Sequence, residues 1–286
     1  MILGSHRAAS DLCSLEPGTH LCALERDGEL DRVAATFVGQ GLAAGDQLLY
    51  VAAEQQVDGL VQRMSEHLDA RHALRTGQLL TSSFELAYGS SRRDRLHAVV
   101  DGSRLAALQA RERGFPGLRV AARMDQLTDL LGSIEEVQTW ERMATDLQRD
   151  LQVSSVCLYD TGRLAPGDVA AVAREHDGLA PQVDVAPIAT FLAVDEPWGV
   201  RVRGEVDVSN RDLLHRLVLS RAAVTPRLRL DLEGVTFADA GTVARLSSIA
   251  AALPEGGHLV LARVPGVVRR ILEATGLGHD RMALEP

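Results

Sequence analysis

The chain has 286 residues, of which 46% are hydrophobic and 3% aromatic, and its formal net charge is −9. This length supports one large domain or two of ordinary size. The acidic balance and the scarcity of aromatic residues argue against nucleic acid as a partner. All 30 basic residues are arginine, so the sequence lacks the phosphate-binding lysine of a nucleotide-binding P-loop.

Targeting signals and a disulfide framework are not predicted. No apolar run is long enough to cross a membrane, and the first residues lack the pattern of a signal peptide. The cysteines, Cys13, Cys22 and Cys157, are scattered and form no CxxC pair. We therefore expect a cytoplasmic protein with reduced thiols, and no membrane partner.

Apolar stripes at helical spacing alternate with short β-rich runs between residues 19 and 180. The alternation predicts an α/β domain with a mostly parallel sheet flanked by helices. The strands are expected at 20–24, 47–52, 78–82, 118–122 and 154–160. The helices are expected at about 30–42 and 56–68, within 92–113, and at 134–149 and 167–176.

The segment HDGLAPQVDVAP at 176–187 interrupts this pattern with two prolines and a glycine, which marks a domain boundary. We divide the chain into a tail at 1–18, a first domain at 19–180, a linker at 181–187 and a second domain at 188–286. The second domain begins with two strands and reads ββαβαβα. Its elements are expected at 191–196, 198–208, 211–223, 227–237, 241–253, 258–264 and 266–274.

Two motifs in the second domain, GEVDVSN at 204–210 and DLEGVTFADAGTVARL at 231–246, resemble the STAS family, which includes bacterial anti-sigma-factor antagonists. The resemblance implies a protein partner, either an anti-sigma factor or a related serine kinase. We expect the partner to dock on the turn at Asp239, which offers a shallow surface of small residues at a helix end, beside the loop after GEVD. The residues expected there are Asp207, Ser209, Asn210, Asp239, Ala240, Gly241 and Thr242.

The family carries a phosphorylated serine directly after the aspartate that matches Asp239, but Ala240 stands at that position here. Alanine has no hydroxyl group, so phosphate cannot be attached at this position. Thr242 aligns with a position that is usually glycine, and we do not expect it to replace the serine. An alternative without partner binding also exists, because Asp239 is a good N-cap residue for any helix.

The first domain resembles the MEDS family of sensory domains. The matching segments are GTHLCAL (18–24), GLAAGDQLLYV (41–51), RTGQLL (75–80), GFPGLRVAARM (114–124) and VCLYD (156–160). The resemblance implies a RecA-like core without nucleotide chemistry and a small-molecule signal. ERDGEL at 25–30 agrees with this expectation, because an acidic loop repels a triphosphate. Arg123 departs from the family, whose members commonly carry glutamate there.

Ligands of open α/β sheets bind at the carboxyl ends of the strands, which gives a set of candidate residues by geometry alone. His20 and Cys22 share one face of their strand, as do Cys157 and Tyr159 of theirs. No carboxylate or second histidine stands at ligand spacing nearby, so we interpret His20 and Cys22 as core residues and predict no metal. The candidate ligand-binding residues are His20, Cys22, Glu25, Glu54, Arg123, Tyr159 and Asp160.

The sequence as a whole predicts a signalling protein without enzymatic activity or cofactor, in which a sensory domain controls partner binding by the second domain. A homodimer is compatible with this prediction. Two alternatives stay open at this point. One is a degenerate RecA-like protein that still binds nucleotide with arginine in place of lysine, and the other is a scaffold within a larger sensory complex.

Overall fold

The computed structural model describes residues 15–64, 70–88, 92–124, 127, 129, 131–180, 188–196 and 198–285, with the side chains of 92–98 excepted. The predicted linker at 181–187 and most of the predicted tail therefore lie outside the described residues. The described chain divides into two compact units. None of its helices is both long and apolar enough to cross a lipid bilayer.

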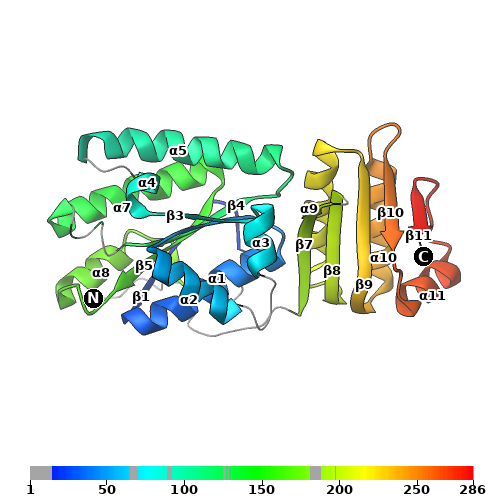
Figure 1. Ribbon diagram of the computed structural model, residues 1–286, viewed down its shortest axis with the longest axis horizontal. Helices are drawn as coiled ribbons and strands as arrows, with labels where there is room; N and C mark the ends of the chain where they lie inside the picture. The colour runs from blue at the N-terminus through cyan, green and yellow to red at the C-terminus, as the bar shows by residue number, and fades with distance from the viewer. Residues whose placement is uncertain are drawn as a thin grey trace. The chain divides into compact units, whose positions relative to one another are not determined.

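The first unit contains a six-stranded sheet in the order β3-β2-β4-β5-β1-β6, in which all pairings are parallel. This arrangement confirms the predicted fold class, a RecA-like parallel sheet flanked by helices (Figure 1). Only the short β6, which pairs with β1, was not predicted. The strands are β1 (His20–Glu25), β2 (Gln47–Val51), β3 (Leu79–Ser82), β4 (Leu118–Arg123), β5 (Ser154–Asp160) and β6 (Gly178–Leu179).

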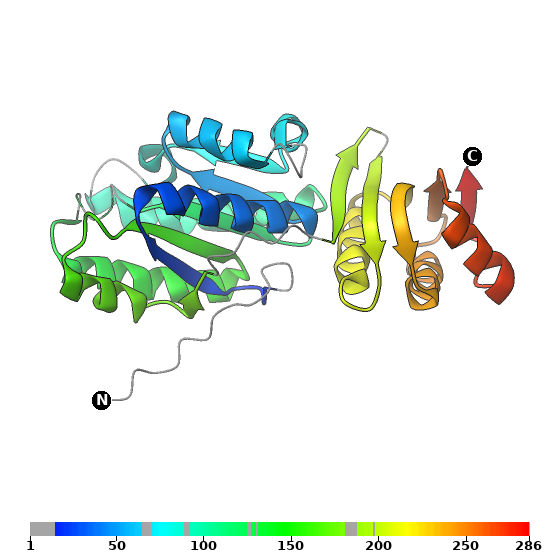
Figure 2. The same cartoon turned by 90° about the horizontal axis from the view of Figure 1, so that it is seen from below.

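Helices cover both faces of this sheet, with α5 and α7 on the face opposite α1 and α2 (Figures 1 and 2). The predicted helices are present, whereas the short α3 and α4 were missed. The predicted helix at 167–176 ends three residues early, so His176 follows the helix. The helices are α1 (Asp27–Ala43), α2 (Glu54–Met64), α3 (Ala70–Thr76), α4 (Phe84–Tyr88), α5 (Arg92–Glu112), α7 (Ile134–Leu151) and α8 (Pro166–Ala173).

Local chemistry at its two ends fixes α7, the helix that faces β1 and β5. Its N-cap Ser133 accepts a hydrogen bond from the backbone N–H of Glu136. At the other end Gln152 adopts the left-handed conformation, and its N–H is directed to the carbonyls of Arg149 and Gln148. The helix is strongly amphipathic and buries Val137, Glu141 and Ala144. A glutamate therefore belongs to the apolar stripe of this helix.

The second unit contains a five-stranded sheet in the order β11-β10-β9-β8-β7. The β7–β8 hairpin is antiparallel and the other pairings are parallel, which confirms the predicted ββαβαβα order with β11 added. The strands are β7 (Ala189–Asp195), β8 (Trp198–Val206), β9 (Arg227–Ala238), β10 (His258–Ala262) and β11 (Met282–Glu285), and the helices are α9 (Arg211–Val224), α10 (Ala240–Ala252) and α11 (Gly266–Thr275).

One face of β8 enters the core of the second unit, as its alternating sequence indicates. Val200, Val202 and Val206 are almost fully buried. Gly199, at the start of the same strand, lies so close to β9 that a Cβ atom would stand 1.9 Å from the carbonyl oxygen of Arg229. Glycine is therefore required there by the close approach of two backbones.

Candidate functional site

The two cysteine-bearing strands of the first unit are neighbours in its sheet. β1 pairs with β5 in a register that places Cys22 opposite Cys157 and His20 opposite Ser155. The two pairs of side chains singled out in the sequence therefore lie on adjacent strands. His20 of β1 and Cys157 and Tyr159 of β5 all face the same helix, α7.

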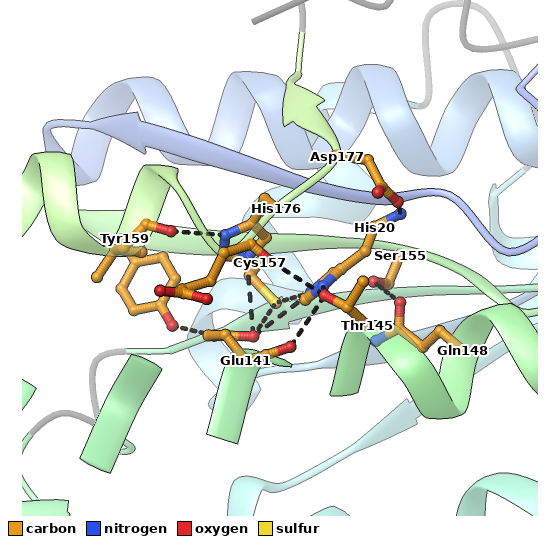
Figure 3. Close-up of polar contacts among 11 residues, drawn as sticks. His20, Glu141, Thr145, Gln148, Ser155, Cys157, Tyr159, His176 and Asp177 are labelled. Carbon is orange, nitrogen blue, oxygen red and sulfur yellow. Dashed lines mark hydrogen bonds and ion pairs between the residues drawn. The ribbon is translucent and has the colours of Figure 1, made fainter. Parts of the chain in front are cut away.

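Five side chains form a buried polar cluster between the sheet and α7 (Figure 3). Oε2 of Glu141 lies 3.4 Å from Nε2 of His20, 3.7 Å from Nε2 of His176 and 3.8 Å from the Cys157 sulfur. The hydroxyl of Tyr159 donates a hydrogen bond to the other carboxylate oxygen, Oε1. We refer to His20, Glu141, Cys157, Tyr159 and His176 as the polar cluster.

The cluster corrects one expectation from the sequence, namely that no carboxylate or second histidine lies near His20. Glu141 and His176 are distant from His20 along the chain, and only the fold brings them to it. The signal for Glu141 was present in the sequence, because its position continues the apolar stripe of α7. His176 gave no such signal, since it lies in the segment that we interpreted as an irregular domain boundary.

Hydrogen bonds outside the cluster fix the orientation of both imidazole rings. Nδ1 of His176 lies 2.9 Å from the carbonyl oxygen of Val172, which can only accept, so this nitrogen carries the proton. Nδ1 of His20 lies 2.6 Å from the Thr145 hydroxyl, whose own proton goes to a carbonyl oxygen of Glu141 or Glu175. His20 is therefore the donor to Thr145. In the tautomer of either ring that carries its proton on Nδ1, the Nε2 lone pair faces the cluster.

Burial dominates the protonation of the cluster. It lowers the pKa of His20 well below the ordinary value, and the neighbouring His176 lowers it further. Burial likewise raises the pKa of Glu141, against the opposing effects of His176 and the Tyr159 hydrogen bond. The pKa values of Cys157 and Tyr159 are raised well above their ordinary values by burial and by Glu141. Without an added cation, the physical expectation for these four side chains is the neutral form.

A cavity of about 240 Å³ adjoins the cluster on the same face of the sheet. Glu141 and Cys157 are among its lining residues. Most of the other lining residues are apolar and come from β2, β4, α4, α5 and α7, including Val51, Val120, Leu86, Val99, Trp140 and Leu147. A mostly apolar lining with a few polar groups is typical of a small-molecule site.

Four of the remaining candidate ligand residues lie at the carboxyl edge of the sheet, whereas Cys22 is buried in the core in the middle of β1. None of these five is among the described residues that line this cavity. Glu25 and Asp160 are paired in the β1–β5 register and are partly exposed, while Glu54 is exposed at the first turn of α2. Arg123 is buried and pairs with Asp27 and Asp31 at the start of α1. These two carboxylates compensate the charge of Arg123.

In the second unit, the turn at Asp239 begins α10 as predicted. Asp239 is the N-cap, and its carboxylate accepts a hydrogen bond of 2.6 Å from the backbone N–H of Thr242. Ala240 is exposed, and Gly241 is partly exposed. Thr242 is buried instead, and its hydroxyl donates to the carbonyl of Val206. Its side chain supports the turn and cannot contact a partner without rearrangement.

The neighbouring turn after β8 also contains both exposed and buried candidate residues. Asp207 is partly exposed and accepts hydrogen bonds from the backbone and the hydroxyl of the exposed Ser209, which lower the pKa of its carboxyl group. Asn210 is buried and hydrogen-bonds the backbone of Asp207 and Glu205. Of the seven predicted partner-binding residues, Asn210 and Thr242 therefore hold the two turns from within.

Comparison with known families decides the identity of the first domain. Residues 19–177 match the family described as MEDS, the methanogen/methylotroph, DcmR sensory domain. The chain belongs to the MEDS family. Its residues 183–285 match the family described as Mlab, STAS domain, so the MEDS domain is joined to a STAS domain.

Solved structures with a similar fold are distant in sequence. The KaiC-like protein PH0186 of Pyrococcus horikoshii OT3 is 12% identical with a TM-score of 0.41, and the match covers 71% of this chain and 88% of that protein. The flagellar accessory protein FlaH of Methanocaldococcus jannaschii is 10% identical with a TM-score of 0.37, and the match covers 58% of this chain and 71% of that protein. A search of curated proteins finds no match.

Proposed function

We propose that this chain is a signalling protein without enzymatic activity, in which the MEDS domain senses a small molecule and the STAS domain binds an anti-sigma factor or a related serine kinase. The observation that carries the proposal is the exposed turn of the STAS domain. Ala240 stands on its surface, at the first position of α10. Partner binding there is not controlled by phosphorylation of the usual serine, because that serine is absent.

The surface around this turn has the composition of a protein-binding site. Val208 is 70% exposed and Phe237 is 45% exposed, and they flank the turns at Asp207 and Asp239. The register pairs Phe237 with Glu205 of β8, three residues before Val208. Exposed apolar side chains beside polar groups are the usual anchors of a protein interface. We refer to Val208, Phe237 and Ala240 as the STAS surface.

The apolar cavity supports a sensory role for the MEDS domain. Its size and lining suit a small, mostly apolar molecule whose polar atom meets Glu141 or Cys157. Such a molecule changes partner binding only if it has different affinities for two states of the protein. A useful response needs a coupling free energy of about 1–3 kcal/mol.

The loop after β1 supports binding rather than nucleotide hydrolysis. α1 begins with Asp27 and Glu29 in its first turn, and the chain contains no lysine. Negative charge at a helix N-terminus opposes the binding of a triphosphate there. The two carboxylates that pair with Arg123 also come from α1, so this arginine is not a substitute for the lysine of a P-loop.

The proposal is tested with the full chain and the purified anti-sigma kinases encoded in the same genome, by isothermal titration calorimetry. We expect one of them to bind, and we expect Phe237→Asp to weaken binding by about tenfold or more, because it places a charge in an apolar contact. Leu284→Asp is the matched control, since Leu284 is 48% exposed on edge strand β11 of the same domain. Equal binding by the two variants, or no binding by the wild type, would contradict the proposal.

A further inference from the structure

We infer that the polar cluster of the MEDS domain is a tetrahedral zinc site whose ligands are His20, Glu141, Cys157 and His176. Each of these residues offers one ligand atom, and the four atoms lie within 4.8 Å of one another. The residues come from β1, α7, β5 and the segment between α8 and β6, so the fold itself assembles the site (Figure 3). All four are buried.

The distances between the ligand atoms suit a single ion. Tetrahedral Zn²⁺, with nitrogen or oxygen at about 2.0 Å and sulfur at about 2.3 Å, places neighbouring ligand atoms about 3.3–3.5 Å apart. In the cluster, Nε2 of His20 is 3.2 Å from the Cys157 sulfur and 3.4 Å from Oε2 of Glu141. Oε2 of Glu141 is 3.7 Å from Nε2 of His176 and 3.8 Å from the sulfur. Small side-chain movements are enough to bring these ligand atoms to the distances of a tetrahedral zinc site.

The outer hydrogen bonds orient each ligand toward the same point. The Nδ1 protons of His20 and His176 are held by Thr145 and by the Val172 carbonyl, which leaves both Nε2 lone pairs for the ion. The Tyr159 hydroxyl donates a hydrogen bond to Oε1 of Glu141, which leaves Oε2 available to the ion. Metal-binding histidines and carboxylates typically have such partners on their other polar atom. Here they are present for three of the four ligands.

One atom of the cluster is left without a hydrogen bond. Nε2 of His176 is buried and makes no hydrogen bond to any described residue. A buried polar atom without a partner is costly, and it needs an explanation by an ion, a water molecule or a rearrangement. The lone pair of this atom faces Glu141, so an ion at the centre of the cluster supplies the missing partner.

Charge also favours a dication. A Glu141 carboxylate and a Cys157 thiolate carry two negative charges, and two neutral histidines add none, so Zn²⁺ makes the buried site neutral overall. Among the described residues, no arginine contacts the carboxylate of Glu141, and the chain has no lysine. Two nitrogens, one oxygen and one thiolate form a borderline-soft ligand set that suits zinc better than magnesium or calcium.

The proposed zinc site lies beside the candidate ligand cavity of the sensory domain. Glu141 and Cys157 belong both to the ligand set and to the lining of the cavity, so the ion adjoins that cavity. It joins two neighbouring strands to α7 and to the segment after α8. The inference does not depend on the proposed function, because metal content is measured without any partner protein.

The experiment uses the full chain without an affinity tag. Elemental analysis is expected to give one zinc ion per chain. After chelator treatment, titration with Co²⁺ is expected to give the visible bands of tetrahedral cobalt and a thiolate-to-cobalt charge-transfer band in the near ultraviolet. Zn²⁺ at about a hundredfold excess over its dissociation constant is expected to raise the thermal midpoint by roughly 5 °C or more.

Cys22→Ser is the matched control for Cys157→Ser, because both cysteines are buried at paired positions of adjacent strands. We expect the charge-transfer band to survive in Cys22→Ser and to disappear in Cys157→Ser, and zinc to be lost in His176→Gln. If Cys157→Ser fails to fold, Cys157→His keeps a nitrogen ligand and should bind cobalt without that band. Wild-type protein that binds no metal, or that binds cobalt without the thiolate band, would overturn the inference.

Discussion

The MEDS and STAS domains use polar side chains in opposite ways. The MEDS domain buries a carboxylate, two imidazoles, a thiol and a phenol between a sheet and a helix. The STAS domain displays its candidate residues on two turns and buries only Asn210 and Thr242, which hold the turns in place. A substitution or a change of protonation in a buried cluster alters the stability of the domain. A substitution in an exposed turn has little effect on folding.

The largest expected effect comes from removing the carboxylate at the centre of the cluster. Glu141→Ala removes the acceptor of the Tyr159 hydroxyl and of the Cys157 thiol, and it removes the carboxylate beside the two imidazoles. We expect the free energy of unfolding of the MEDS domain to fall by about 3–5 kcal/mol. Denaturant titration followed by Trp140 fluorescence, with Trp198→Phe as the background, measures this domain alone.

Glu135→Ala is the control for this substitution, since Glu135 is exposed in the first turn of the same helix. Its expected effect is within about 0.5 kcal/mol. Equal losses in the two variants would show that the cluster contributes no more to stability than a surface residue, and the comparison between the two domains would fail.

Alkaline pH is expected to lower the unfolding free energy of the MEDS domain more than that of the STAS domain. This difference is smaller than the effect of Glu141→Ala. Burial raises the pKa of Cys22 to about 12 from an ordinary value of 9.0. Between these values the folded state keeps a proton that the unfolded state releases, so stability falls as pH rises above 9. The loss approaches about 1.4 kcal/mol per pH unit for this group. All cysteines and tyrosines of the chain precede residue 160, so the STAS domain lacks this source of alkaline sensitivity.

The measurement is denaturant unfolding from pH 8 to 11 in the presence of a chelator. Trp198 reports the STAS domain in a Trp140→Phe background, and Trp140 reports the MEDS domain in a Trp198→Phe background. We expect a steeper decline for the MEDS domain, and a shallower one after Cys22→Ala. Similar slopes in both domains would show that the buried thiol does not control the alkaline response.

The fold was largely predictable because its signals are local. The periodicity of 2 in Val200, Val202 and Val206 and the helical stripes of the first domain each depend on nearby residues. The missed elements are short or lie at an edge. β6 has two residues and β11 has four, and both depend on pairing with a distant strand.

The candidate site was only partly predictable for the opposite reason. His20, Cys157 and Tyr159 attracted attention because alternation on a strand is visible in the sequence. Their meeting with Glu141 and His176 depends on how α7 packs and where α8 ends, which no local pattern encodes. A glutamate within the apolar stripe of a helix was the available signal, because burial of an isolated carboxylate is unfavourable unless other groups meet it.

The smallest effect on stability is expected for a substitution in the exposed turn of the STAS domain, although this substitution adds a group that a kinase can phosphorylate. Ala240→Ser restores a hydroxyl group at the first position of α10, and we expect a change within about 0.5 kcal/mol in unfolding free energy. With a binding kinase and ATP, mass spectrometry should detect phosphate on the introduced hydroxyl of this variant, since a helix N-terminus favours the added charge.

The wild type is expected to carry no phosphate at this turn under the same conditions, and Ser209→Ala in both backgrounds excludes the neighbouring exposed serine. Phosphorylation should then weaken kinase binding by the Ala240→Ser variant alone, because about two negative charges enter beside Asp239. Phosphate on Thr242 of the wild type would contradict this expectation. It would require the buried hydroxyl to leave the Val206 carbonyl, and the turn would then be a mobile switch rather than a fixed surface.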